Sequence, residues 1–228
     1  MGNQASAPAP TQDAKPKDAD GFNTRGNDYR TVGENDRAIE SYSEAIRLNP
    51  NHSAAFNGRG AAYRSKGDYE RAIADYDEAL RLNPRNHEAF NNRGNAYRIK
   101  GNYDRAIEDL NEAVRLNPNY ALAFTNRGIA YRDKGDYDRA IQDQDKAIRL
   151  NPSFVVAYRN RGDVRFEQGN FAAAAQNFAR AAELDPSNLL ALPCRDARRT
   201  TRSCEPREPR ATTRPRQMAG RRSCFLSR

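Results

Sequence analysis

The sequence predicts an all-α solenoid built from five helix–turn–helix repeats. Its first sign is a recurring Leu-Asn/Asp-Pro tripeptide, whose prolines follow one another every 34 residues at Pro50, Pro84, Pro118, Pro152 and Pro186. Glycine keeps the same interval at Gly26, Gly60, Gly94, Gly128 and Gly162, and alanine does so at Ala38, Ala72, Ala106, Ala140 and Ala174. A fixed period of this length indicates one supersecondary unit stacked on its own copies.

The second copy, residues 53–86, predicts two helices joined by a tight turn. Apolar and small residues first recur at helical spacing, at Phe56, Gly60 and Tyr63. Gly67 then suits a left-handed position at the end of the first helix, and Asp68 can cap the next helix by accepting from its free N–H groups. One hairpin of this kind cannot bury its own apolar faces, so it needs neighbours.

The second helix of this unit carries its own apolar stripe, formed by Tyr69, Ala72, Ile73, Tyr76, Ala79 and Leu80. We expect this helix to stop just before Pro84, because proline lacks the N–H that would continue it. Small residues opposite large aromatic ones allow the two helices to approach closely.

These residues resemble the tetratricopeptide repeat, in which an aromatic residue, Gly, Tyr, Ala, an aromatic residue, Ala and Pro recur over 34 residues. The second copy gives this series as Phe56, Gly60, Tyr63, Ala72, Tyr76, Ala79 and Pro84. The third gives it as Phe90, Gly94, Tyr97, Ala106, Leu110, Ala113 and Pro118. The resemblance covers about residues 19–188 and points to bacterial members. It implies a right-handed superhelix whose first helices line a concave groove for a peptide, and a protein-interaction scaffold rather than an enzyme.

Some copies depart from the pattern. Asn35 replaces the aromatic residue that begins the second helix elsewhere, Gln144 stands where the second copy has Tyr76, and Arg165 takes the place of Tyr63. We therefore expect the terminal copies to be the looser ones. The repeats are expected at residues 19–52, 53–86, 87–120, 121–154 and 155–188.

Both ends differ from the repeats in composition. Residues 1–18, rich in Ala, Pro, Gln and Lys, are expected to form a disordered leader. Residues 189–228 are expected to hold a truncated capping helix and then a disordered tail. The segment from Ser187 to Leu192 begins like a helix that would cover the last repeat, but from Pro193 onwards the apolar periodicity is lost.

The positive charge of the chain lies in this tail. The net charge is +8, and residues 193–228 alone contain eleven Arg and three acidic residues. Residues 1–192 therefore hold 27 basic and 27 acidic residues and are neutral. The tail could bind nucleic acid or an anionic surface, which is the alternative function. It could also result from translation in a shifted reading frame, which we favour because the break falls inside an element that the fold requires.

Other classes of function find little support. Cys194, Cys204 and Cys224 form no Cys-x-x-Cys pair, so neither a zinc site nor a disulfide framework is expected, and no cofactor is. His52 and His87 fall at repeat junctions and are expected to be surface or capping residues rather than general bases. The acidic residues of the second helices are expected to form a solvated convex face, as in Asp75, Asp77 and Glu78.

The N-terminus suggests a cytoplasmic protein, because it lacks the apolar core of a secretory signal and no apolar run approaches a membrane span. A periplasmic location would require a true N-terminus that lies upstream. Gly2 to Ser6 fits the short Met-Gly-x-x-x-Ser myristoylation pattern, which leaves a membrane-attached adaptor as a third class.

An arginine precedes each repeat glycine, at Arg25, Arg59, Arg93, Arg127 and Arg161. We call these the hairpin arginines. We expect their stems to pack and their guanidinium groups to pair with second-helix acids at Asp75, Asp109 and Asp143, rather than to bind a ligand.

A second face of the first helices carries the candidate binding residues: Asn23, Asn27, Arg30, Asn57, Arg64, Asn91, Asn95, Arg98, Asn126, Arg132, Arg159 and Asn160. Stacking in register would place four of them in a row, which we call the face arginines: Arg30, Arg64, Arg98 and Arg132. Guanidinium groups suit carboxylates, and Asn amides suit the backbone of an extended peptide. Two interpretations stay open. The face binds an acidic segment or a C-terminal carboxylate of an unidentified protein, or it is a solvated polar surface that repeats because the unit was duplicated.

Some tetratricopeptide repeat proteins hold a terminal carboxylate with a set of Lys, Asn and Arg residues. The resemblance places Asn91, Asn95, Asn126 and Asn160 at positions of such a clamp. Val156 stands where a Lys would be expected, which argues against a clamp of the chaperone type.

Overall fold

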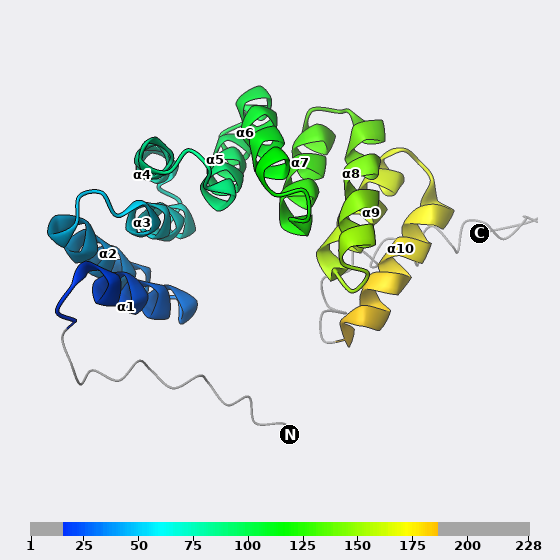
Figure 1. The fold of residues 1–228 in the computed structure, drawn as a ribbon. Coiled ribbons are helices and arrows are strands. Elements are labelled where there is room, and N and C mark those ends of the chain that lie inside the picture. Colours follow the sequence, from blue (N-terminus) through cyan, green and yellow to red (C-terminus); the bar gives the residue numbers. More distant parts are fainter. Residues whose placement is uncertain (1–15, 187–228) are drawn as a thin grey trace, which may run out of the picture. The chain divides into compact units, whose positions relative to one another are not determined.

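The computed structural model describes residues 16–186, and within that range every regular element is a helix (Figure 1). The helices form five consecutive hairpins, which confirms the predicted fold class. The first helices of the hairpins are α1 (Ala19–Thr31), α3 (Ser53–Ser65), α5 (His87–Ile99), α7 (Ala121–Asp133) and α9 (Val155–Glu167). The second helices are α2 (Asn35–Leu48), α4 (Tyr69–Leu82), α6 (Tyr103–Leu116), α8 (Tyr137–Leu150) and α10 (Phe171–Leu184).

The turn inside each hairpin depends on a glycine in the left-handed region. In the second repeat Gly67 has φ 81°, and Asp68 then accepts a hydrogen bond from the backbone N–H of Arg71 at the start of α4. Both features were predicted from the sequence and are confirmed. Since side chains other than Gly rarely adopt such a φ, the turn is set locally.

The junction between repeats is equally local. Helix α4 ends at Leu82, two residues before Pro84, as expected. His52 precedes α3 and accepts a hydrogen bond from the backbone N–H of Ala55, which confirms a capping role.

The core of each hairpin is a large second-helix side chain lying against the repeat glycine. A Cβ on Gly60 would lie 2.8 Å from the ring of Tyr76, and one on Gly94 would lie 2.9 Å from Leu110. Ala72 and Ala79 flank Tyr76 and are fully buried. Glycine at this position therefore lets the two helices approach until the large side chain fills the space between them.

Stacking of the hairpins creates two unlike sides. Each second helix packs against the first helix of the next repeat, and the first helices of successive repeats also contact one another. Within residues 16–186, the second helices of successive repeats make no such contact. The first helices thus lie on the tighter side, and we call the surface they form the inner face. The expected leader up to residue 15, the capping segment from Ser187 and the Arg-rich tail lie outside the described residues.

Candidate peptide-binding face

The hairpin arginines bridge the two helices of a repeat. The Arg59 guanidinium donates from Nε and Nη2 to the two carboxylate oxygens of Asp75, at 2.8 and 2.7 Å. Arg93 pairs in the same way with Asp109, and Arg127 with Asp143. The predicted pairing is confirmed in the three middle repeats.

The end repeats replace the carboxylate by a neutral acceptor. Arg25 donates to the Ser41 hydroxyl at 3.3 Å, and Arg161 donates to the Asn177 amide oxygen at 2.6 Å. Burial raises the pKa of Asp109, and the bonds from Arg93 only partly oppose that rise. The carboxylates of the middle repeats are therefore buried charges held by their arginines.

The expectation of a solvated acidic face is wrong for Asp75. Its side chain is buried because the hairpin geometry brings Arg59 over it. Asp77 and Glu78 are more exposed, but each has a partner, since Asp77 accepts from Arg93 at 2.6 Å and Glu78 from Arg81 at 2.8 Å.

Asparagine side chains pair across the inner face from one first helix to the next. The Asn92 amide N–H donates to the Asn57 oxygen at 3.1 Å, and Asn126 donates to Asn91 at 2.8 Å. Both pairs join residues 35 positions apart. We call these two pairs the asparagine ladder. Asn92 was not among the candidate residues, although its 35-residue separation from Asn57 is a signal that could have found it.

The asparagine ladder is interrupted at both ends of the array. At the N-terminal end Gly58 stands where Asn92 lies one repeat later, and the buried Oδ1 of Asn23 has no hydrogen-bond partner in the described structure. At the C-terminal end Thr125 replaces Asn91, and Nδ2 of Asn160 and Oγ1 of Thr125 are both buried without a partner among residues 16–186.

A second set of polar groups lies at the large core residues of the first, second and fourth hairpins, Tyr42, Tyr76 and Gln144. The Tyr42 hydroxyl donates to the Asn27 oxygen at 2.7 Å. One repeat later Ala61 occupies the position of Asn27, and the buried Tyr76 hydroxyl finds no partner in the part of the chain that the structure describes. Burial raises the pKa of Tyr76 to about 12, against the opposing charges of Arg64 and Arg30.

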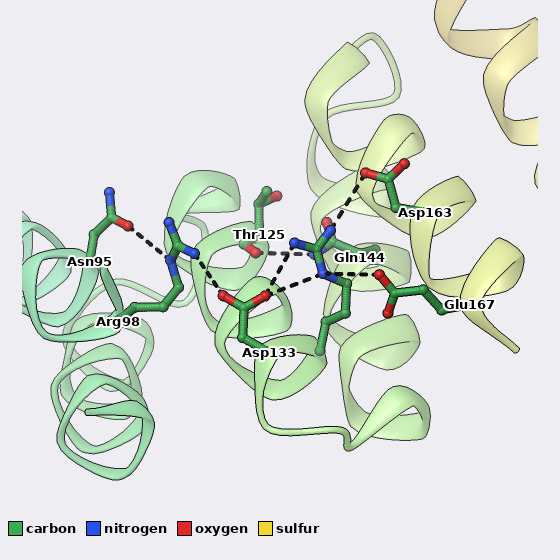
Figure 2. Close-up of polar contacts among 8 residues, drawn as sticks. Asn95, Arg98, Thr125, Asp133, Gln144, Asp163 and Glu167 are labelled. Carbon is green, nitrogen blue, oxygen red and sulfur yellow. Dashed lines mark hydrogen bonds and ion pairs between the residues drawn. The ribbon is translucent and has the colours of Figure 1, made fainter. Parts of the chain in front are cut away.

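Gln144 is the corresponding core residue of the fourth repeat. Its Nε2 donates to the backbone carbonyl of Thr125 at 3.1 Å (Figure 2), whereas its Oε1 is without a partner within the described range. Ile129 occupies the position of Asn27 here and offers no polar group. The side chain is fully buried, as are those of Tyr76 and Thr125.

Two of the face arginines belong to a charge cluster that joins α5, α7 and α9 (Figure 2). Arg98 donates to Asp133 at 2.7 Å and to Asn95 at 3.2 Å. Arg132 contacts the other oxygen of Asp133 at 3.1 Å, and lies 3.5 Å from a carboxylate oxygen of Asp163.

Glu167 completes this cluster, with a carboxylate oxygen 3.9 Å from Nε of Arg132. Burial raises the pKa of Asp163, and the charges of Arg132 and Arg159 oppose the rise. Neither Asp133 nor Glu167 was a candidate from the sequence. Both lie 35 residues after a face arginine, the same separation as in the asparagine ladder.

The other two face arginines lack such partners. Arg30 and Arg64 form no ion pair with any carboxylate of residues 16–186. Ser65 and Ile99 stand 35 residues after them, where Asp133 follows Arg98. The Arg30 side chain is exposed and that of Arg64 is half-buried. The predicted row of four arginines is therefore divided into two electrostatically different pairs.

Residues 16–186 contain neither a metal-binding cluster nor a membrane-spanning helix. That part of the chain brings together no group of three or more His, Cys, Asp or Glu side chains able to hold a metal ion. None of its helices combines the length and the apolar character that crossing a bilayer requires.

A family model for the tetratricopeptide repeat matches residues 23–84, 60–121 and 125–188. The chain belongs to the tetratricopeptide repeat family. The family and the fold together make it a protein-interaction scaffold. No curated protein matches its sequence significantly.

Solved structures of other tetratricopeptide repeat proteins are similar over most of the chain. MamA is 29% identical with a TM-score of 0.61, over 72% of this chain and 95% of that one. YrrB, described as a tetratricopeptide repeat protein with an unusual peptide-binding site, is 26% identical with a TM-score of 0.59, over 78% and 92%. TTC0263 from Thermus thermophilus is 22% identical with a TM-score of 0.67, over 81% and 97%, a likeness of fold.

Proposed function

We propose that this chain binds an extended segment of a partner protein along the inner face and carries out no chemistry itself. The observation that carries the proposal is a set of buried polar atoms without partners in the described residues: Asn23 Oδ1, Thr125 Oγ1 and Asn160 Nδ2 on the first helices, and Tyr76 Oη in the hairpin core. A buried polar group left unpaired costs about 1–3 kcal/mol. An extended peptide offers one N–H and one C=O per residue, which are the groups that could satisfy these atoms.

Exposed apolar side chains on the first helices support the same proposal. Ile99, Leu122 and Val156 are 38–44% exposed. An apolar side chain of a bound segment would remove part of this surface from water, which stabilises a complex by about 25 cal/mol per Å². YrrB, similar in fold and sequence, is described as having a peptide-binding site.

The histidines argue for binding rather than catalysis. His52 caps α3 and contacts Asp20 at 3.1 Å, and His87 contacts the Asn117 amide at 3.2 Å and the Tyr120 ring. Both are engaged in holding helix ends together, so neither has the free base and adjacent nucleophile that acid–base chemistry requires.

An array of random octapeptides probed with the full chain tests this proposal. We expect a subset of peptides to bind, and their binding to fall about tenfold when Leu122→Ser and Val156→Ser are combined. Leu48→Ser is the matched control, because Leu48 is 41% exposed but lies on a second helix. Equal binding by the double variant and the wild type would contradict the proposal, as would the absence of any bound peptide.

A further inference from the structure

We infer that the inner face recognises acidic segments, and that it does so in the first two repeats alone, where Arg30, Arg64 and the Tyr76 hydroxyl receive a carboxylate. The inference rests on the proposed function and names the chemistry and the place of binding. Its starting point is that all four face arginines share one register, while only Arg98 and Arg132 have carboxylate partners in the described residues.

The carboxylates of the last three repeats already occupy the face arginines there. Arg98 and Arg132 are surrounded by three carboxylates, those of Asp133, Asp163 and Glu167. Arg159, whose charge also acts on Asp163, brings the positive charges to three, so this region has no net positive charge to offer an acidic ligand. An incoming carboxylate would have to displace an existing partner and approach the remaining acids, and both steps cost free energy.

The first two repeats present the opposite balance. Arg30 and Arg64 supply two positive charges, and the residues that stand where Asp133 would be are the uncharged Ser65 and Ile99. Asp28 is the nearest acidic residue along α1 and forms no ion pair within residues 16–186. A guanidinium without a carboxylate is the state in which an external one can bind in a charge-assisted bond.

Tyr76 adds an independent observation. Its side chain is fully buried, and its hydroxyl has no partner in the described structure because Ala61 replaces the asparagine that serves Tyr42. The charges of Arg64 and Arg30 both act on this hydroxyl. Two guanidinium groups without a carboxylate and one O–H without an acceptor are therefore gathered here. A carboxylate accepts hydrogen bonds at both oxygens and donates none, so it matches this set.

The test uses the full chain and two fluorescein-labelled octapeptides, one alternating Ala and Glu and the other alternating Ala and Gln. We expect the Glu peptide to bind at least about tenfold more tightly, since charge-assisted bonds exceed neutral ones. Arg30→Gln combined with Arg64→Gln should lower the affinity for the Glu peptide to that for the Gln peptide. The matched control, Arg98→Gln combined with Arg132→Gln, should leave the affinity for the Glu peptide within about twofold of wild type.

Tyr76→Phe separates recognition from folding. Because the hydroxyl is unpaired in the free chain, its removal should leave the urea midpoint at pH 7 no lower than that of the wild type. The same variant should lower the affinity for the Glu peptide about threefold to tenfold, because one hydrogen-bond donor is lost. Tyr42→Phe should leave that affinity unchanged, since the Tyr42 hydroxyl already donates to Asn27.

Equal losses from the two arginine pairs would overturn the inference, and so would equal affinities for the Glu and Gln peptides. If both peptides bind equally but the Leu122→Ser and Val156→Ser combination still weakens them, the proposed function stands and this inference fails. If no octapeptide binds, the proposed function fails as well. Circular dichroism of each variant shows whether the helices are intact.

Discussion

The first two repeats and the next two carry the same arginine near the end of the first helix, in different surroundings. Arg98 and Arg132 are held by carboxylates from the next first helix, whereas Arg30 and Arg64 have Ser65 and Ile99 in the corresponding places. The position of an arginine in the repeat therefore does not determine its role.

The large core residues of the hairpins divide in the same way. The first two repeats bury tyrosines at this position, Tyr42 and Tyr76, while the next two bury Leu110 and Gln144. Of these four, only the N-terminal pair supplies hydroxyl groups beside face arginines. A repeated unit can therefore present different charges at its two ends when only a few residues change. These are the residues on the inner face and those that contact the next repeat.

The largest effect expected from this difference is an alkaline loss of stability that originates in Tyr76. Burial raises the pKa of Tyr76 to about 12, while an unfolded chain loses this proton near pH 10. The folded state thus holds the proton more tightly. Its stabilisation is complete below about pH 10 and is lost as the pH rises to about 12, a fall of about 2–3 kcal/mol.

Urea unfolding of the wild type and of Tyr76→Phe at pH 9, 11 and 12 measures the pH-dependent contribution of Tyr76 to the free energy of unfolding. Other tyrosines titrate in both proteins and cancel in the comparison. We expect the difference between the two free energies of unfolding to shift in favour of the Phe variant as the pH rises. Parallel pH profiles would show that the Tyr76 hydroxyl is as accessible as an ordinary phenol.

Asp133→Asn should leave Arg98 without a carboxylate partner, as Arg30 and Arg64 are in the first two repeats. The substitution removes the carboxylate that Arg98 and Arg132 share, and leaves Arg132 with its longer contacts to Asp163 and Glu167. Because the pair is only partly buried, we expect a loss of about 1–2 kcal/mol in the free energy of unfolding. The freed Arg98 should raise the affinity for the alternating Ala-Glu octapeptide several-fold.

Asp104→Asn is the control for this experiment. Asp104 pairs with Lys134 across the same kind of repeat boundary, but its side chain is 75% exposed. Neither stability nor peptide affinity should change measurably. An Asp133 variant that behaves like this control would mean that the charge cluster holds neither arginine.

The fold could be predicted because its determinants are local and repeated. The turn glycine Gly67, the cap Asp68 and the helix-ending Pro84 each act on a few neighbouring residues, and each is visible in every copy of the unit or nearly so. The hairpin arginines were predictable for a related reason. Arg59 and Asp75 are 16 residues apart within one hairpin, so the geometry of a single repeat brings them together.

The organisation of the inner face could not be predicted to the same extent, because its bonds cross from one repeat to the next. The pattern within a single helix predicts Asn57 and Asn91 but not Asn92, and Arg98 but not Asp133. The charge of Asp75 alone predicts a solvated position, because it does not show that Arg59 of the same hairpin covers the carboxylate. Residues 35 positions apart are the pairs that such a sequence should be searched for.

The smallest expected effect tests that spacing directly at the interrupted C-terminal end of the asparagine ladder. Thr125→Asn should give Asn160 the acceptor that Asn91 gives Asn126, and should raise the free energy of unfolding by about 1 kcal/mol. The Gln144 bond to the backbone carbonyl of residue 125 does not involve the side chain and should persist. Adding Asn160→Ala should abolish the gain, so that a double-mutant cycle in urea isolates the pair. If Thr125→Asn raises the free energy of unfolding equally in the wild type and in the Asn160→Ala variant, the stabilisation comes from packing around Gln144. In that case residues 125 and 160 do not form a further pair of the asparagine ladder.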